Sequence, residues 1–140
     1  MILAIRIAGQ VDRTEKVKET LFRLRLRRKY AAVLLQPTKT NLKILQKVRN
    51  EIAYGSINSE TLALLVQKRA KNKEKSKKLD QKKVLDQIEK TSHDKWDIKP
   101  FFRLHPPRGG IDAKKHFGVT KKAVLGDNKD KINDLVRRML

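Results

Sequence analysis

Within the first 58 residues, three apolar runs of strand length alternate with two amphipathic segments of helix length. The runs read "ILAIRIA", "YAAVLLQP" and "EIAYGSI". In the first run, Ile5 and Ile7 alternate with Arg6, which predicts a strand half buried against helices. Two helices of this length cover one face of a three-stranded sheet, so the order β-α-β-α-β predicts an α+β sandwich over residues 1–58.

Helix signals lie between and beyond these runs. The pattern of apolar residues predicts two helices inside the first 58 residues, a third after them, a short amphipathic piece at Val84, Leu85 and Ile88, and a C-terminal helix. The expected N-terminal caps are Asp12 with Glu15, Thr38 or Thr40, Ser59, and Asp127 or Asn128. The expected buried stripes are Val17, Leu21 and Leu24; Leu42, Leu45 and Val48; Leu62, Leu65 and Val66; and Ile132, Leu135, Val136 and Met139.

Residues 59–140 are therefore expected to form a helical and extended basic extension of the 1–58 core. Its C-terminal helix is expected to pack back on that core. Between Trp96 and about Leu125 the sequence is rich in Gly and Pro, and this stretch is expected to be irregular.

Charge dominates the composition. The chain has 35 Lys and Arg residues against 15 Asp and Glu residues, a net charge of +20 and a pI near 10.5. Both parts contribute, because residues 1–58 hold 13 basic and 4 acidic residues and the remainder holds 22 and 11. A surface this basic is stabilised by a polyanion, with nucleic acid the leading candidate and an anionic membrane surface the second.

Other classes of protein are disfavoured by what the chain lacks. It contains no cysteine, and no stretch approaches the roughly 18 apolar residues of a membrane span. The N-terminal run is too short for a signal peptide. We therefore expect a cytoplasmic protein that does not insert into membranes.

The stretch "FRLRLRRKY" places five cations at the junction of the first helix and the second strand: Arg23, Arg25, Arg27, Arg28 and Lys29. Five cations at one corner repel one another unless an anion lies between them, and arginine forks bind phosphate in bidentate fashion. The alternative is a solvated helix end whose charges favour the helix dipole, which explains one or two cations rather than five. We favour the nucleic-acid interpretation.

Residues 101–110, "FFRLHPPRGG", have an unusual composition. The two prolines hold the backbone extended, and the two glycines permit positive φ. With Arg103 and Arg108 beside the prolines, the stretch resembles a stiff finger that fits a crevice in folded RNA. The alternative is a structural loop that crosses the protein's own surface.

A lysine-rich run at residues 68–83 holds nine basic and two acidic residues. Such a run has little to bury. A solvated linker and an arm that lies along RNA explain it equally well.

Signs of catalysis are weak. The three histidines, His93, His105 and His116, have no metal-ligand spacing. The glycine motifs that hold phosphates, GxxxxGK(S/T) and GxGxxG, do not occur in the sequence. The stretch "GDNKD" at residues 126–130 is better explained by helix capping than by calcium binding. We expect no catalytic residue, no metal and no cofactor.

The opening unit, with "LRLRRKYAAVLL" at its first helix-to-strand corner, resembles the large-subunit ribosomal protein L-thirty family. The pieces "NSETLALLVQKR", "FFRLHPPRGG" and "GDNKDKINDLVRRML" resemble the long archaeal form of that family, which is related to the eukaryotic L-seven protein. The resemblance covers essentially all 140 residues. One departure is the lysine-rich "IDAKKHFGVTKKAVLG", where many relatives are glycine-rich.

The resemblance implies a ferredoxin-like-related fold, with a three-stranded antiparallel sheet in the order 3-1-2 and two helices on one face. It also implies a structural role in the large ribosomal subunit, one copy per ribosome, bound to large-subunit ribosomal RNA beside neighbouring ribosomal proteins. The RNA-binding residues expected from charge and resemblance together are Arg23, Arg25, Arg27, Arg28, Lys29, Lys39, Arg103, His105, Pro106, Pro107, Arg108, Gly109, Gly110, Lys114 and Lys115.

Two other functions stay open at this point. A free-standing nucleic-acid chaperone or chromatin-type protein would share the charge but would not need a rigid PPRGG loop. An RNA-processing enzyme would need a convergent set of acid, base or metal groups, which the sequence does not show.

Overall fold

The computed structural model describes residues 1–73, 80–90, 95–111, 113–120 and 122–140. The strands are β1 (Ile2–Arg6), β2 (Ala31–Leu35), β3 (Ile52–Ser56), β4 (Phe102–Arg103), β5 (Ala113–His116) and β6 (Ala123–Asp127). The helices are α1 (Glu15–Arg23), α2 (Lys39–Lys47), α3 (Ser59–Arg69), α4 (Gln81–Lys90), the 3-10 helix η2 (Lys129–Lys131) and α5 (Ile132–Met139).

The sheet is larger than the sequence predicts. In the described part of the chain it has six strands in the order β4-β2-β1-β3-β6-β5, so the expected three-stranded sheet is wrong. The centre is antiparallel, with β1 between β2 and β3. Strand β4 adds to β2 in antiparallel fashion, and β6 and β5 add to β3 in parallel fashion. The extension thus contributes strands to both edges of the unit formed by residues 1–58.

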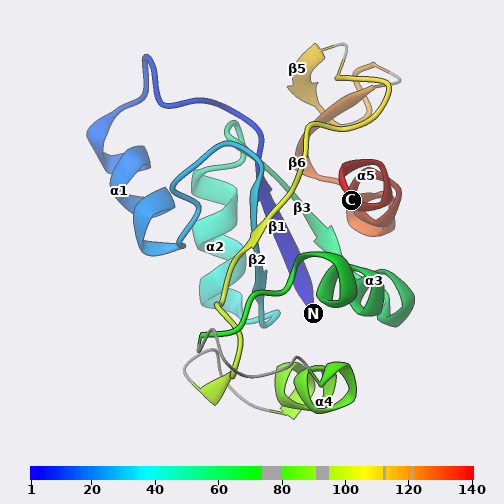
Figure 1. Cartoon of the computed structure of the whole chain (residues 1–140). Helices are drawn as coiled ribbons and strands as arrows, with labels where there is room; N and C mark the ends of the chain where they lie inside the picture. Colours follow the sequence, from blue (N-terminus) through cyan, green and yellow to red (C-terminus); the bar gives the residue numbers. More distant parts are fainter. Residues whose placement is uncertain (74–79, 91–94, 112, 121) are drawn as a thin grey trace.

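Helices cover both faces of the sheet: the two helices predicted within residues 1–58 share one face, as expected, and the helices of the extension cover the other. Helices α1 and α2 pack on one face, where Leu21 and Leu45 lie in one buried cluster with Ala4 and Val33 of the strands. Helices α3, α4 and α5 cover the other face, where Leu65, Ile88 and Val136 join a cluster with strand residues. Figure 1 shows α1 and α2 on one side of the central strands and α3 and α5 on the other.

The stretch from Trp96 to Leu125 is less irregular than expected. It contains β4, β5 and most of β6, while Trp96, Ile98, Phe102 and Leu104 are buried in the main cluster. Strands this short give little periodic signal, because their partners are distant in sequence.

The helix starts differ from the sequence expectation at three of four places. Helix α1 begins at Glu15 after Thr14, and Asp12 takes a positive φ of 57° in the preceding loop. Helix α3 is capped by Asn58, whose side chain accepts from Thr61 N, rather than by Ser59. The Thr38 cap of α2 is confirmed, since its side-chain oxygen accepts from Asn41 N at 3.2 Å.

At the fourth start, Asn128 is the N-cap residue of η2, and the Asp127 carboxylate accepts a hydrogen bond from Lys129 N at 2.9 Å. Helix α5 itself begins later, at Ile132.

Most of the predicted stripes are buried. The stripes of α3 and α5 are confirmed throughout, as are Leu21, Leu45, Val48, Val84 and Ile88, whereas Leu42 is exposed. Of the lysine-rich run at 68–83, residues 68–69 end α3 and residues 81–83 begin α4. Residues 74–79 lie outside the described ranges.

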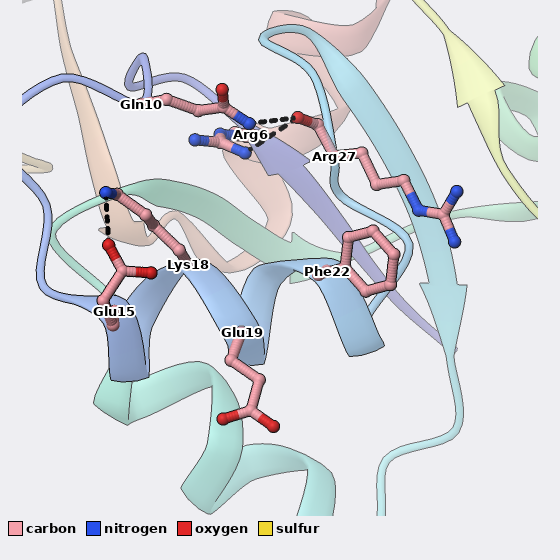
Figure 2. A pocket seen from close by; sticks show the side chains of 7 residues that line it. All are labelled: Arg6, Gln10, Glu15, Lys18, Glu19, Phe22 and Arg27. Carbon is pink, nitrogen blue, oxygen red and sulfur yellow. Dashed lines mark hydrogen bonds and ion pairs between the residues drawn. The ribbon is translucent and has the colours of Figure 1, made fainter.

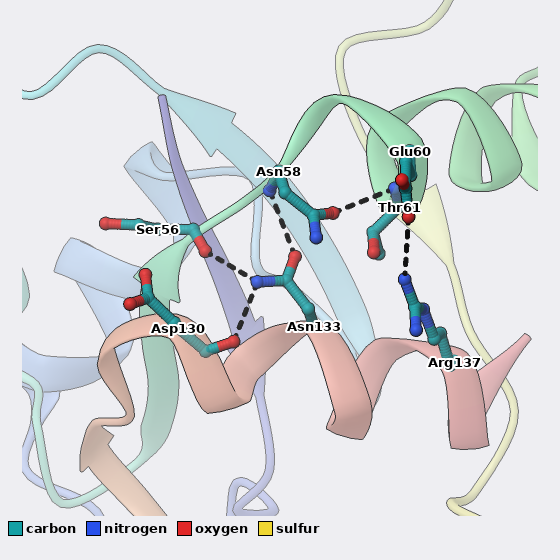
Figure 3. A network of polar contacts seen from close by, with 7 residues as sticks. All are labelled: Ser56, Asn58, Glu60, Thr61, Asp130, Asn133 and Arg137. Atoms are coloured by element: carbon teal, nitrogen blue, oxygen red, sulfur yellow. Dashed lines mark hydrogen bonds and ion pairs between the residues drawn. The ribbon is translucent and has the colours of Figure 1, made fainter.

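A polar network ties α5 to β3 and α3 (Figure 3). The buried Asn133 side chain accepts from Asn58 N at 3.0 Å and donates to Ser56 O at 3.1 Å and Asp130 O at 2.7 Å. Because the same amide satisfies three backbone groups, it fixes α5 to the end of β3 and the start of α3.

Replacing Asn133 with alanine is expected to reduce the free energy of unfolding by about 1–3 kcal/mol, because buried backbone groups lose their partners. Urea denaturation followed by circular dichroism measures the change. The control is Arg137→Ala, which removes only the exposed ion pair with Glu60 at 3.3 Å and should cost about 0.5 kcal/mol or less. Equal losses in both variants would contradict the role of Asn133.

Candidate nucleic-acid interface

The interface begins with a buried arginine at the end of β1. Arg6 is only 2% exposed, so β1 is buried along its whole length rather than half buried as expected. Its guanidinium donates to the carbonyl oxygens of Ala8 (2.9 Å) and Gly9 (2.9 Å) on one loop. It also donates to the carbonyl oxygens of Leu26 (2.9 Å) and Arg27 (3.1 Å) on another. One side chain therefore holds two loops together.

Burial lowers the pKa of Arg6, while the nearby Glu51 carboxylate opposes this shift and Arg13 adds to it. Glu51 in turn forms an ion pair with Arg13 at 2.8 Å, and its backbone carbonyl accepts from Ile7 N and Ala8 N. An arginine pKa starts so far above neutrality that Arg6 keeps its charge at neutral pH. A charged, hydrogen-bonded group of buried residues therefore supports the cation-rich loop, residues 24–30 between α1 and β2.

The loop after α1 turns the cations outward. Leu26 N donates to Leu21 O at 2.8 Å, and the Leu26 side chain is fully buried. Arg25 has a positive φ of 62°, which reverses the chain between helix and strand. With Leu26 pointing inward, its neighbours Arg25, Arg27 and Arg28 are all exposed.

The sheet brings this loop together with the segment that follows Phe101. Ala31 at the start of β2 pairs with Arg103 in β4. The two segments line one pocket of about 460 Å³, formed by Arg25, Arg27, Arg28, Ala31, Phe101 and Arg103. We call it the arginine pocket. None of these lining residues is acidic, so four arginines line one pocket without a carboxylate.

The HPPRGG segment is held against the protein itself. Its backbone is hydrogen-bonded to the end of α5. His105 N donates to Met139 O at 3.0 Å, and Arg108 N donates to Arg138 O at 2.9 Å. The Arg138 side chain donates back to Arg108 O at 2.9 Å and Gly110 O at 2.6 Å. The backbone thus follows the alternative of a loop crossing the protein surface, while the side chains of His105, Pro106 and Arg108 are exposed.

The other predicted RNA-binding residues do not gather at this pocket. Arg23 forms an ion pair with Glu19 at 2.5 Å, and the Lys29 ammonium lies 4.9 Å from the Tyr30 ring centroid. Lys39 opens α2, beyond the opposite end of β2. Lys115 is exposed on β5, and the side chain of Lys114 lies outside the described part of the chain.

The sequence did not predict the role of two residues at the interface. Arg6 holds the backbone of the cation-rich loop, and Arg138 holds the backbone of the HPPRGG segment. Neither gives a usable signal. Arg6 fits an alternating strand pattern, and Arg138 fits the preference of cations for a helix C-terminus.

Among the described residues, no three His, Cys, Asp or Glu side chains gather as a metal site would require. None of the helices within the described ranges is long and apolar enough to cross a bilayer.

Known proteins resemble this chain over its whole length. A protein named large ribosomal subunit protein uL30 from Archaeoglobus fulgidus is 37% identical over 154 residues, covering 99% of each chain. The chain belongs to the ribosomal protein L30p/L7e family. The family model of that description matches residues 2–52. Proteins of the same name from Methanobrevibacter smithii and Ignicoccus hospitalis are 34% and 35% identical and cover all of this chain.

Membership of the L30p/L7e family confirms the resemblance found in the sequence. It also confirms the expectation of a ribosomal protein of the large subunit rather than an enzyme. The family match over residues 2–52 includes β1, α1, β2 and α2, and therefore Arg6 and the cation-rich loop.

Proposed function

We propose that this L30p/L7e protein binds large-subunit ribosomal RNA and that the arginine pocket holds its phosphates. The observation that carries the proposal is the meeting of Arg25, Arg27 and Arg28 with Arg103 in one pocket whose lining has no carboxylate. Four arginines that line one pocket repel one another in the free protein. A phosphate backbone relieves that repulsion and accepts their hydrogen bonds.

Affinity in this scheme is electrostatic, and orientation is geometric. Each cation that replaces a counterion on a phosphate adds binding that weakens as salt rises. The Arg6 hydrogen bonds fix the backbone of Leu26 and Arg27, so the cations are held in place before RNA arrives. A site preorganised in this way loses less entropy on binding.

The exposed side chains of the HPPRGG segment form a second contact in this proposal. His105 and Arg108 project from a backbone anchored on α5, with Gly109 and Gly110 at positive φ beside them. Such a rigid edge suits recognition of RNA shape and backbone rather than of base sequence. In this proposal, each large subunit holds one copy of the protein, which contacts neighbouring ribosomal proteins.

The proposal predicts a large loss of affinity when the pocket is reversed in charge. The double variant Arg27→Glu, Arg28→Glu is expected to bind large-subunit ribosomal RNA about 100-fold more weakly, because charge-assisted hydrogen bonds are replaced by repulsion. The slope of log affinity against log salt concentration should become shallower by about two, one for each lost phosphate contact. Filter binding over a salt series measures both quantities.

The matched control is Lys82→Glu, Lys83→Glu in the first turn of α4. These two neighbouring lysines are exposed, and α4 lies on the face of the sheet opposite α1 and α2. The net charge changes by the same amount, so this variant should show only a several-fold loss. An equal loss in both variants, with native circular dichroism, would contradict the assignment of the pocket.

A further inference from the structure

A second pocket lies on the other side of Arg27. It has a volume of about 420 Å³ and lies between α1 and the loops that Arg6 holds together (Figure 2). Its lining residues are Arg6, Gln10, Glu15, Lys18, Glu19, Phe22 and Arg27. Arg27 lines this pocket and the arginine pocket, so the two are neighbours.

Arg27, the residue that lines both pockets, forms a stacked pair with Phe22. The Arg27 guanidinium carbon lies 3.9 Å from the centroid of the Phe22 ring. Phe22 is 55% exposed, although it occupies a helix whose other large apolar residues face the core or its edge. Figure 2 shows the ring and the arginine side chain next to each other at one side of the pocket. An exposed aromatic ring stacked with a guanidinium is a surface on which RNA-binding proteins stack unpaired bases.

The charges of the second pocket differ from those of the first. Glu15 and Glu19 are in its lining, and each carboxylate uses one oxygen in an ion pair, with Lys18 at 2.7 Å and Arg23 at 2.5 Å. Such carboxylates disfavour a phosphate. Gln10, a polar uncharged residue of the lining, donates from its amide nitrogen to Arg27 O at 3.3 Å. The lining therefore suits a neutral, planar group with polar edges.

We infer that this pocket takes an unstacked nucleobase of the RNA, which stacks on the platform of Phe22 and Arg27. The inference rests on the proposed function, because the phosphates beside that base lie in the arginine pocket. A volume of about 420 Å³ is within the range of small-molecule pockets and accommodates one base. The platform reads an exposed base, so it distinguishes single-stranded from double-stranded RNA.

The test compares two probes, a single-stranded adenine 12-mer and a 12-base-pair RNA duplex, by fluorescence anisotropy. Phe22→Leu keeps an apolar side chain but removes the ring. It should bind the 12-mer about tenfold or more weakly and the duplex within about twofold of the native protein. Phe22→Tyr should restore binding of the 12-mer. The control Leu42→Ala, at an exposed apolar residue of α2, should change neither affinity.

Three outcomes overturn the inference. If Phe22→Leu binds the 12-mer like the native protein, no base stacks there. If that variant keeps its RNA affinity but is lost from large subunits, a protein side chain occupies the pocket. The variant Arg28→Glu, Arg103→Glu separates the two proposals, because neither residue lines the second pocket. It should weaken binding of both probes, and unchanged binding of both would overturn the proposed function together with the inference.

Discussion

The Arg6→Met variant is expected to lose about 3–5 kcal/mol of unfolding free energy. The carbonyl oxygens of Ala8 and Leu26 are buried partners of this guanidinium, and each would lose its hydrogen bond. A buried acceptor left without a partner costs about 1–3 kcal/mol. Methionine fills a similar volume, so the loss reflects polar contacts rather than a cavity.

Arg6→Lys should lie between the native protein and Arg6→Met, because an ammonium keeps the charge but cannot span both loops. The control Arg23→Met removes an exposed arginine with one ion-pair partner, Glu19, and should cost about 0.5 kcal/mol or less. Guanidinium denaturation gives the three values. If Arg6→Met were as stable as Arg23→Met, the structural role of Arg6 would be wrong.

Replacing Gly55 with alanine is the second large effect, with an expected loss of about 3 kcal/mol. A Cβ atom on this β3 residue would overlap the carbonyl oxygen of Lys129 and would lie 3.0 Å from the Cβ of Ile132. The backbone of η2 and the start of α5 would have to move away from the sheet. Because the Arg138 side chain and backbone anchor the HPPRGG segment, that segment should also loosen.

Gly9→Ala is the matched control for this prediction, since nothing lies within 4 Å of a Cβ atom placed on Gly9. It should change the unfolding free energy by about 0.5 kcal/mol or less. Thermal unfolding gives the stability of both variants, and hydrogen exchange at residues 105–110 reports on the loop. A Gly55→Ala protein with native stability would show that α5 does not pack as closely on β3 as described.

The central unit could be predicted from the sequence because its signals are local. Three apolar runs fix β1, β2 and β3, and residues such as Leu21, Leu45 and Val48 mark the buried faces of the helices. Helix starts were less accurate, because Asn58 and Ser59 are both good caps and only the backbone decides between them.

The rest depends on contacts between residues distant in sequence. Strand β4 has two residues and is held by its partner Ala31–Ala32, so no pattern within it reveals a strand. Arg6 has the same periodicity as an exposed strand residue, and only the position of the Leu26 loop shows that its guanidinium is buried. That helices cover both faces of the sheet could not be predicted without knowing where α3, α4 and α5 pack.

The candidate site also combines features that local sequence reveals with features that depend on contacts distant in sequence. The cation-rich corner and the residues around Phe101 were both found by composition, but their meeting in one pocket follows from the pairing of β2 with β4. Similarly, the HPPRGG segment was found by its composition, while its attachment to α5 required the structure.

We expect RNA contacts of the arginine pocket to hold this protein in the large subunit. The most direct test is co-sedimentation of the tagged native protein and its Arg27→Glu, Arg28→Glu variant with ribosomal subunits after a high-salt wash. We expect the native protein to stay in the large-subunit peak at one copy per particle, while the variant moves to the light fractions. Release of the native protein would contradict binding through the arginine pocket, because charge alone would then drive association, as in a free-standing nucleic-acid chaperone.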